Sequence, residues 1–457
     1  MIQLFMSILV SLPCFSSVLQ SEGAQSITYS RETDNGYLIL GSLSDGWGGV
    51  PHLVIYTMDQ YGVVISQTEA AFTGEPARAA DFQDGAVVVC TDGENNVSRV
   101  AYFDNTGSEQ WLSILPGGAL GNAAVRATGS DFIVAGNDSE APRVARFDNL
   151  GNLLWNVSYP AMPFSVRDVC SYNGEIFVLG TAEEPGWQSN VCLLVLNDAG
   201  GVLELHTLFS GEGRLSPEAI EVDSRGLFIL LNAMTDLNNM IFETRLLKLN
   251  FSLETIWTGS LSGSSWERGS DMVTLGNGGF GVCGWTNSLP LSESNRSDMV
   301  LAEFDENGQT AWRRTHGTSS TDYGLSLSAV SDGGFLVSGC VTEALYKGWL
   351  VKTDSLGLLE PQGVSDFQPP AFSAVPLSNP LVNGMLSFTV NTSDSRVIHV
   401  SVYDMAGRTV AGISRAVAAG ANQINLNTDV PSGVYSVRVS SDKHESIFRA
   451  VVCGGAE

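Results

Sequence analysis

The chain has 457 residues, a length that suits about three domains unless repeats form one large unit. Its 49 glycines and 16% charged residues are typical of a turn-rich folded β protein rather than a disordered one. The net charge of −26 argues against nucleic acid or an anionic membrane as a partner, because both bind surfaces rich in Lys and Arg.

Residues 1–24 contain an apolar run, LFMSILVSLPCF, followed by small and polar residues. This pattern predicts a secretory signal peptide, although no Lys or Arg precedes Arg31. Cys14 offers a lipoprotein alternative, but Leu12-Pro13 is a poor context for lipidation. Nowhere else are there 18 consecutive apolar residues, so we expect no membrane span.

A turn motif repeats along the next 300 or so residues. FDNTGSEQW (103–111), FDNLGNLLW (147–155) and FDENGQTAW (304–312) each have Asp, Gly three residues later and Trp seven residues after the Asp. The Asp recurs, sometimes as Asn, at seven positions spaced 44 to 55 residues apart, and a second turn signal with a short apolar run precedes each. The seven positions are Asp59, Asp104, Asp148, Asn197, Asn250, Asp305 and Asp354.

Both turn residues have a physical reason. Asp or Asn accepts hydrogen bonds from backbone amides of the turn, and Gly adopts the left-handed conformation without a Cβ clash. Gly follows in six of the seven units, and Leu253 is the exception. The Trp then lies on the outgoing strand, where a large ring fills space against the next unit.

Four-stranded units at this period predict an all-β fold, a seven-bladed β-propeller over residues 26–362. Because strands alternate in direction, the two tight turns of each unit share one face, and the connections of variable length share the other. The segment between the two turn signals varies from 12 to 21 residues, so the second face is the diversified one, where binding residues usually lie. LLEPQG, the outer strand of the last unit, is a poor strand former, which leaves the closure of the ring open.

Four tryptophans fall in the variable loops, and exposed Trp can stack on sugars or contact a protein partner. They are the candidate ligand-binding residues, for a glycan or a protein: Trp47, Trp187, Trp266 and Trp285.

A proline-containing linker is predicted at 363–375, before a small β-sandwich at 376–457. SNP (378–380), VYDMAGR (402–408) and SGVYSVRV (432–439) occur in order there. With them this tail resembles the type A C-terminal sorting domain of the type IX secretion system of Gram-negative bacteria, and the propeller half resembles repeats that often precede such tails in secreted proteins. The resemblance rests on Asn379, Pro380, Tyr403, Asp404, Gly407, Arg408, Gly433 and Tyr435.

That resemblance implies contact with the type IX machinery, export through the periplasm, and release or attachment at the outer cell surface. A related FlgD-like immunoglobulin fold shares VYDxxGR and SGVY and is the alternative for the tail. The family usually stops after a basic-apolar final strand, whereas five more residues, CGGAE, end this sequence.

No catalytic, metal or cofactor motif stands out. There is no GxSxG, no CxxC and no calcium loop, and the propeller histidines lie in three different units, with His316 the one we would mutate. Five cysteines lie in apolar runs; Cys283 and Cys340, at similar places in successive units, are the expected disulfide pair if one forms.

The main hypothesis is therefore a non-enzymatic extracellular binding protein. An extracellular hydrolase of polysaccharide or peptide, with its site at the axis of the variable face, is the alternative. Convergence of carboxylates from three or more blades at that axis would favour the hydrolase. A purely structural surface component is a third hypothesis, which burial of the loop tryptophans would favour.

Overall fold

The structure is a computed structural model of the chain. It describes residues 13–19, 23–45, 49–138, 141–162, 164–184, 188–209, 214–236, 241–263, 265–288, 296–359, 372–376, 385–392, 395–404, 408–418, 420–427, 430–431, 433–441 and 444–452. The chain divides into two compact units, Met1–Pro361 and Gln362–Glu457.

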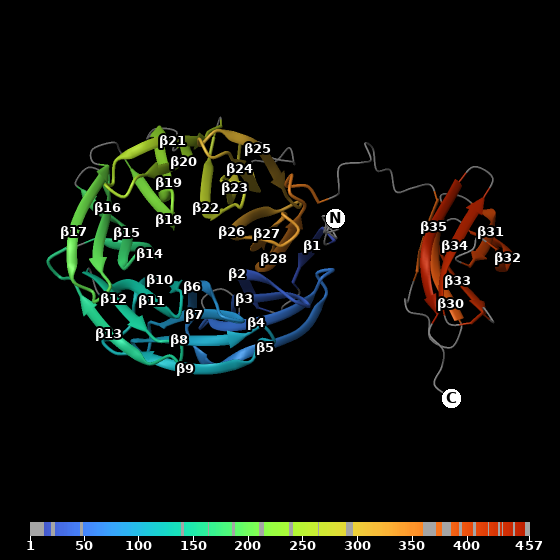
Figure 1. Ribbon diagram of the computed structural model, residues 1–457, viewed down its shortest axis with the longest axis horizontal. Coiled ribbons are helices and arrows are strands. Elements are labelled where there is room, and N and C mark those ends of the chain that lie inside the picture. The colour runs from blue at the N-terminus through green and yellow to red at the C-terminus, as the bar shows by residue number, and fades with distance from the viewer. Residues whose placement is uncertain are drawn as a thin grey trace, which may run out of the picture. The chain divides into compact units, whose positions relative to one another are not determined.

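The first unit is a ring of seven four-stranded antiparallel sheets, which confirms the predicted seven-bladed propeller (Figure 1). In the first six blades the strands follow chain order from the axis outwards. Blades one to three comprise β2 (Ala24–Thr33), β3 (Gly36–Ser44), β4 (His52–Asp59), β5 (Val64–Thr73), β6 (Glu75–Phe82), β7 (Gly85–Asp92), β8 (Val97–Asp104), β9 (Glu109–Leu115), β10 (Gly121–Thr128), β11 (Asp131–Asp138), β12 (Ala141–Phe147) and β13 (Leu153–Ser158). Blades four to six comprise β14 (Ser165–Tyr172), β15 (Glu175–Glu184), β16 (Gln188–Asn197), β17 (Val202–Phe209), β18 (Leu215–Asp223), β19 (Gly226–Asp236), β20 (Ile241–Leu249), β21 (Thr255–Leu261), β22 (Glu267–Thr274), β23 (Phe280–Thr286), β24 (Asp298–Phe304) and β25 (Thr310–His316).

The seventh blade closes the ring with a strand from the other end of the chain. It contains β26 (Thr321–Ala329), β27 (Phe335–Thr342) and β28 (Tyr346–Thr353), and its outer strand is β1 (Phe15–Val18). β1 runs antiparallel to β28, and Ser16 accepts a hydrogen bond of 2.9 Å from the indole of Trp349. The sequence did not reveal this strand. β1 lies within residues 1–24, so a signal peptide of that length would include the strand that closes the ring.

The seven Asp or Asn turns share one hydrogen-bond pattern. In the turn at Asp148, one carboxylate oxygen accepts the amides of Leu150 (2.9 Å) and Asn152 (2.8 Å), and the Gly151 amide donates to the Asp148 carbonyl. Gly151 has φ 78°, the left-handed conformation that the sequence predicts. Leu253 adopts the same conformation at φ 61°, where its side chain is buried between two blades.

The tryptophan of each motif packs on the glycine of the following turn, as the repeat predicts. A Cβ on Gly151 would lie 2.7 Å from Trp111, and a Cβ on Gly308 would lie 2.5 Å from Trp257. The same relation joins Trp155 to Gly200 and Trp312 to Gly357. The indole ring of one blade therefore fits only over a residue without a side chain in the turn of the next blade.

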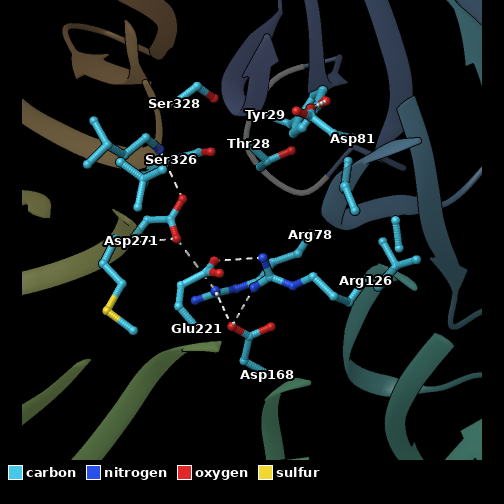
Figure 2. Close-up of a pocket in the computed structure, with 18 of the residues that line it drawn as sticks. Thr28, Tyr29, Arg78, Asp81, Arg126, Asp168, Glu221, Asp271, Ser326 and Ser328 are labelled. Atoms are coloured by element: carbon cyan, nitrogen blue, oxygen red, sulfur yellow. Dashed lines mark hydrogen bonds and ion pairs between the residues drawn. The ribbon is translucent and has the colours of Figure 1, made fainter. Parts of the chain in front are cut away.

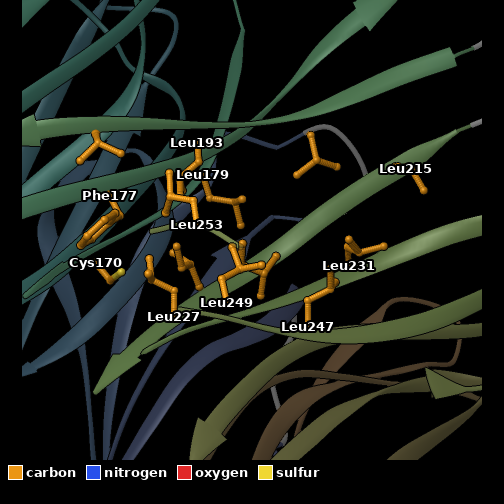
Figure 3. Close-up of a cluster of buried hydrophobic side chains, with 14 of the residues drawn as sticks. Cys170, Phe177, Leu179, Leu193, Leu215, Leu227, Leu231, Leu247, Leu249 and Leu253 are labelled. Carbon is orange, nitrogen blue, oxygen red and sulfur yellow. The ribbon is translucent and has the colours of Figure 1, made fainter. Parts of the chain in front are cut away.

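The core consists of seven apolar clusters, one between each pair of neighbouring blades. The cluster between the fourth and fifth blades joins Phe177 and Leu193 to Leu231 and Leu247 (Figure 3). Leu19, directly after β1, is 3% exposed in the cluster between the seventh and first blades. Burial of aliphatic surface on both sides of every sheet thus holds the ring together.

The expected disulfide between Cys283 and Cys340 is wrong, because both thiols are free. Cys283 packs with Val337 and Val341 between the sixth and seventh blades. Successive side chains of a strand point to opposite faces, so Cys340 on β27 points to the other side of the seventh sheet. A blade therefore separates the two sulfurs.

The second unit has two facing sets of strands. One sheet has the order β29–β30–β33 and the other the order β32–β31–β34–β35, which agrees with the predicted small sandwich. β29 begins within the predicted linker, so the domain starts a few residues before position 376. The bounds are β29 (Phe372–Pro376), β30 (Met385–Thr392), β31 (Arg396–Tyr403), β32 (Thr409–Val417), β33 (Gly420–Asn427), β34 (Gly433–Ser441) and β35 (His444–Val452).

Candidate functional site: the loop face and the axial channel

The predicted loop tryptophans divide into two pairs. Trp47 and Trp187 lie outside the described residues. Trp266 precedes β22, and Trp285 lies on β23 near the variable connection to β24; both are partly buried. Both belong to the face formed by the variable connections, called the loop face below. Being neither buried nor fully exposed, they do not favour a purely structural role.

Trp266 and Trp285 belong to an aromatic row that crosses three blades. Ring centroids are 6.0 Å apart from Phe242 to Trp266, 5.5 Å from Trp266 to Trp285 and 5.6 Å from Trp285 to Tyr323. The guanidinium of Arg268 lies over two of the rings, 4.8 Å from the centroid of Phe242 and 5.6 Å from that of Trp285. Aromatic and Arg side chains are the types enriched where proteins bind partners. The row brings together residues that are 81 positions apart in the sequence.

The inner strand of every blade contains a β-bulge, and several of these bulges bring charged residues to the axis. The register between the first and second strands shifts once in every blade, at the same level. Such a bulge re-aims a side chain. Residues at these shifts include Thr28, Arg78, Asn122, Arg167, Glu218 and Leu325, and all six line a cavity of about 590 Å³ at the loop-face end of the channel.

Two arginines cross the middle of the channel (Figure 2). Arg78, from the second blade, lies 3.2 Å from Asp168 and 3.8 Å from Asp271 in the fourth and sixth blades. Arg126, from the third blade, pairs with Glu221 at 2.6 Å and with Asp168 at 3.4 Å. Asp168 also accepts the Ile220 amide at 2.9 Å, which ties adjacent inner strands together.

This network shifts the pKa of its members in opposite senses. Burial raises the pKa of Glu221 and of Asp271 above their usual values. Burial opposes the charge of Arg78 and of Arg126, but the carboxylates beside them outweigh it, so both pKa values are raised. The arginines therefore stay charged and hold the carboxylates in place.

Two further cavities adjoin the network. One of about 270 Å³ lies between Arg78, Asp271 and Ser328. Another of about 540 Å³ opens on the loop face between the seventh and first blades, where Tyr323, Tyr346 and Glu75 line it. Tyr323 thus belongs both to the aromatic row and to this cavity.

His316, a candidate for mutation, ends β25 and is 8% exposed. Its Nε2 lies 3.1 Å from the carbonyl of Gly357, and burial lowers its pKa. These contacts place it in the packing between blades. Among the described residues, no three His, Cys, Asp or Glu side chains are grouped so as to hold a metal ion, and no helix could span a membrane.

The described part of the tail motif forms a turn and a core contact. Asp404 caps the turn after β31, where its carboxylate accepts the Arg408 amide at 2.9 Å and the Arg408 side chain at 2.7 Å. Tyr403 pairs with Ser436, and Gly433 begins β34. The buried Tyr435 donates a hydrogen bond of 2.7 Å to the Pro431 carbonyl. Asn379, Pro380 and Gly407 lie outside the described residues.

Comparison with known proteins gives one family match and several structural likenesses. Residues 379–453 match the family model described as the secretion system C-terminal sorting domain. The chain is similar to the β-propeller domain of the Trilobed protease from Pyrococcus furiosus, at 11% identity and TM-score 0.45, over 77% of this chain and 98% of that one. The Dos1 propeller is similar at 10% identity and TM-score 0.45, over 76% and 96%. No curated protein matches.

The match covers all three motifs that carried the resemblance in the sequence except for the first residue of SNP. A seven-bladed propeller therefore precedes a type IX C-terminal sorting domain, and the protein is exported to the cell surface or secreted.

Proposed function

We propose that this protein is a non-enzymatic extracellular binding protein, and that its loop face at the fifth to seventh blades contacts the ligand. The observation that supports this most is the aromatic row from the buried Phe242 to the partly buried Trp266, Trp285 and Tyr323, with the Arg268 guanidinium over two of its rings. Its four members come from three blades, so the propeller fixes the spacing between them. Two of the three ring contacts are edge to face and that between Trp266 and Trp285 is tilted, so the rings do not form one flat platform.

The experiment uses the full chain on arrays of glycans and in pull-downs of extracellular proteins. Trp285→Ala is expected to weaken binding at least tenfold, since loss of an aromatic contact at a binding site costs about 2 kcal/mol or more. Leu150→Ala is the matched control, because Leu150 is an exposed residue of a tight turn on the opposite face. Binding that survives Trp285→Ala unchanged would count against the loop face.

One observation supports the hydrolase alternative. Carboxylates from three blades, Asp168, Glu221 and Asp271, converge at the axis, and two of them have raised pKa values. Arg78 and Arg126 nevertheless contact all three, which keeps these carboxylates from acting on a substrate. Hydrolysis of polysaccharides or peptides by the wild type that is lost in Glu221→Gln and Asp271→Asn would restore the alternative.

A further inference from the structure

Arg167 differs from every other arginine in the described part of the propeller. Each of the others has a polar or ring contact. Arg167 has none among the described residues, where its Nε is a buried nitrogen without a hydrogen-bond partner. A buried donor without a partner costs about 1–3 kcal/mol, so it calls for an explanation.

Two acidic residues of the inner-strand network, one beside Arg167 in the sequence and one at the bulge of the next blade, are already engaged. Asp168 is held by Arg78, Arg126 and the Ile220 amide. Glu218, at the corresponding bulge of the next blade, accepts hydrogen bonds of 2.8 Å from Ser216 and 3.0 Å from Asn232. Neither carboxylate makes a hydrogen bond or an ion pair with Arg167.

Arg167 lines the 590 Å³ cavity at the loop-face end of the channel. Arg78 lines this cavity and the deeper one, so its ion pairs with Asp168 and Asp271 form the floor. Thr28, Thr91 and Asn122 also line the cavity, and the buried Thr28 hydroxyl has no hydrogen-bond partner among the described residues. Glu75 and Leu325 line both this cavity and the one that contains Tyr323, so the two adjoin.

We propose that Arg167 binds the carboxylate of an acidic sugar at this cavity, within an oligosaccharide that continues over Tyr323 toward the aromatic row. The inference rests on the proposed function and names its ligand class. The guanidinium fork matches a carboxylate in shape and charge. Glu75 and Glu218 favour a uronate over an acidic peptide, because the hydroxyls beside the carboxylate of a uronate can donate hydrogen bonds to these Glu side chains, and glutamate side chains have no such hydroxyls.

The test measures binding of the full chain to oligosaccharides of galacturonate, glucuronate and mannuronate, to their methyl esters, and to a hexaglutamate peptide. The acids are expected to bind at least tenfold more tightly than the esters, and more weakly as salt is raised. Arg167→Gln is expected to remove that preference, and Arg167→Lys to retain part of it. Arg415→Gln, an exposed arginine of β32 in the tail, is the control and is expected to change nothing.

Melting of each variant separates binding from folding. Arg167→Gln is expected not to lower Tm, because no partner is lost. Suppose that Trp285→Ala abolishes glycan binding, whereas Arg167→Gln changes neither glycan binding nor the preference for acids over esters. The acidic-sugar inference then falls and the proposed function stands. If Trp285→Ala leaves glycan binding unchanged, the proposed function falls as well. Absence of binding to every uronate, or tighter binding of hexaglutamate, would overturn the acidic-sugar site.

Discussion

The ring of Phe15 lies against Gly62 so closely that a Cβ on Gly62 would be 2.5 Å from the Phe15 Cδ2 atom. Gly62 belongs to the Asp59 turn of the first blade, and Phe15 is on β1, the outer strand of the seventh. Phe15 thus has the place that Trp111, Trp155, Trp257 and Trp312 have in other blades. It also meets Tyr37 edge to face, with centroids 5.5 Å apart. β1 therefore repeats the contact between blades that the internal repeats make.

This contact predicts that the exported protein retains β1. A chain that starts at Ala24 is expected to have a Tm lower by 5 °C or more, because β28 loses its partner strand and Leu19 leaves the core. Phe15→Ala is expected to show a smaller decrease. The N-terminus of the exported protein, measured by mass spectrometry, is expected at or before Phe15. An exported protein that starts after Leu19 and melts like the full chain would contradict this.

Because tryptophan packs on glycine between blades, replacing two left-handed glycines by alanine is expected to cost different amounts of stability. Gly308 has φ 77° and the Trp257 ring against it, whereas Gly129 has φ 72° and nothing within 4 Å of an added Cβ. Gly129→Ala is expected to lower the free energy of unfolding by about 1 kcal/mol through backbone strain. Gly308→Ala is expected to cost about 2 kcal/mol or more, because the ring must also move. Equal losses in urea unfolding would show that the contact between blades is unimportant.

The turn aspartates predict loss of stability in acid. Hydrogen bonds from the side chain and backbone of Asn152 lower the pKa of Asp148. A lowered pKa in the folded state means that the stabilisation is present above the unfolded value, about 3.9, and is lost as pH falls through the folded value. Asp148→Asn is expected to keep the turn, as Asn197 and Asn250 do. Its Tm is expected to fall less between pH 7 and pH 3 than that of the wild type. An equal fall of Tm in the variant and the wild type would show that the Asp148 carboxylate does not cause the loss of stability in acid.

The axial network predicts that Arg78 stabilises the ring. Arg78→Met leaves Asp168 and Asp271 without one counter-charge, and a cost of about 2–3 kcal/mol is expected for a partly exposed arginine. Arg167→Met is the matched control at the corresponding inner-strand bulge of the fourth blade, and little change is expected because Arg167 has no partner among the described residues. Chemical denaturation measures both. Similar losses for the two variants would argue against the network as the cause.

The local part of the fold could be predicted because it depends on local chemistry. The Asp, the Gly at +3 and the Trp at +7 each act within a turn or on the next turn, so their repetition was enough to count blades. β1 was missed because its four residues, FSSV, begin at the end of an apolar run without a turn signal, and their partner strand is more than 300 residues away. The expected Cys283–Cys340 pairing was wrong because similar places in two units say nothing of the sheet between them.

The site was predictable only in part. The position of Trp266 and Trp285 near variable connections was a usable signal. Phe242 and Tyr323 sit on strands among many apolar residues, and only their closeness in space marks them. Arg167 could have been found by aligning the inner strands, since it follows Val166 at the shift common to all blades. Its lack of a partner among the described residues depends on the placement of side chains from several blades, which a sequence does not give.

Hydrogen exchange tests the central claim most directly. The full chain is compared alone and with the oligosaccharide that binds best on the array. Protection is predicted at residues 265–268, 285–288 and 321–323 of the loop face, and not at the tight turns 60–63, 105–108 and 149–152. Protection at the tight turns alone, or around the outer strands, would contradict binding at the loop face.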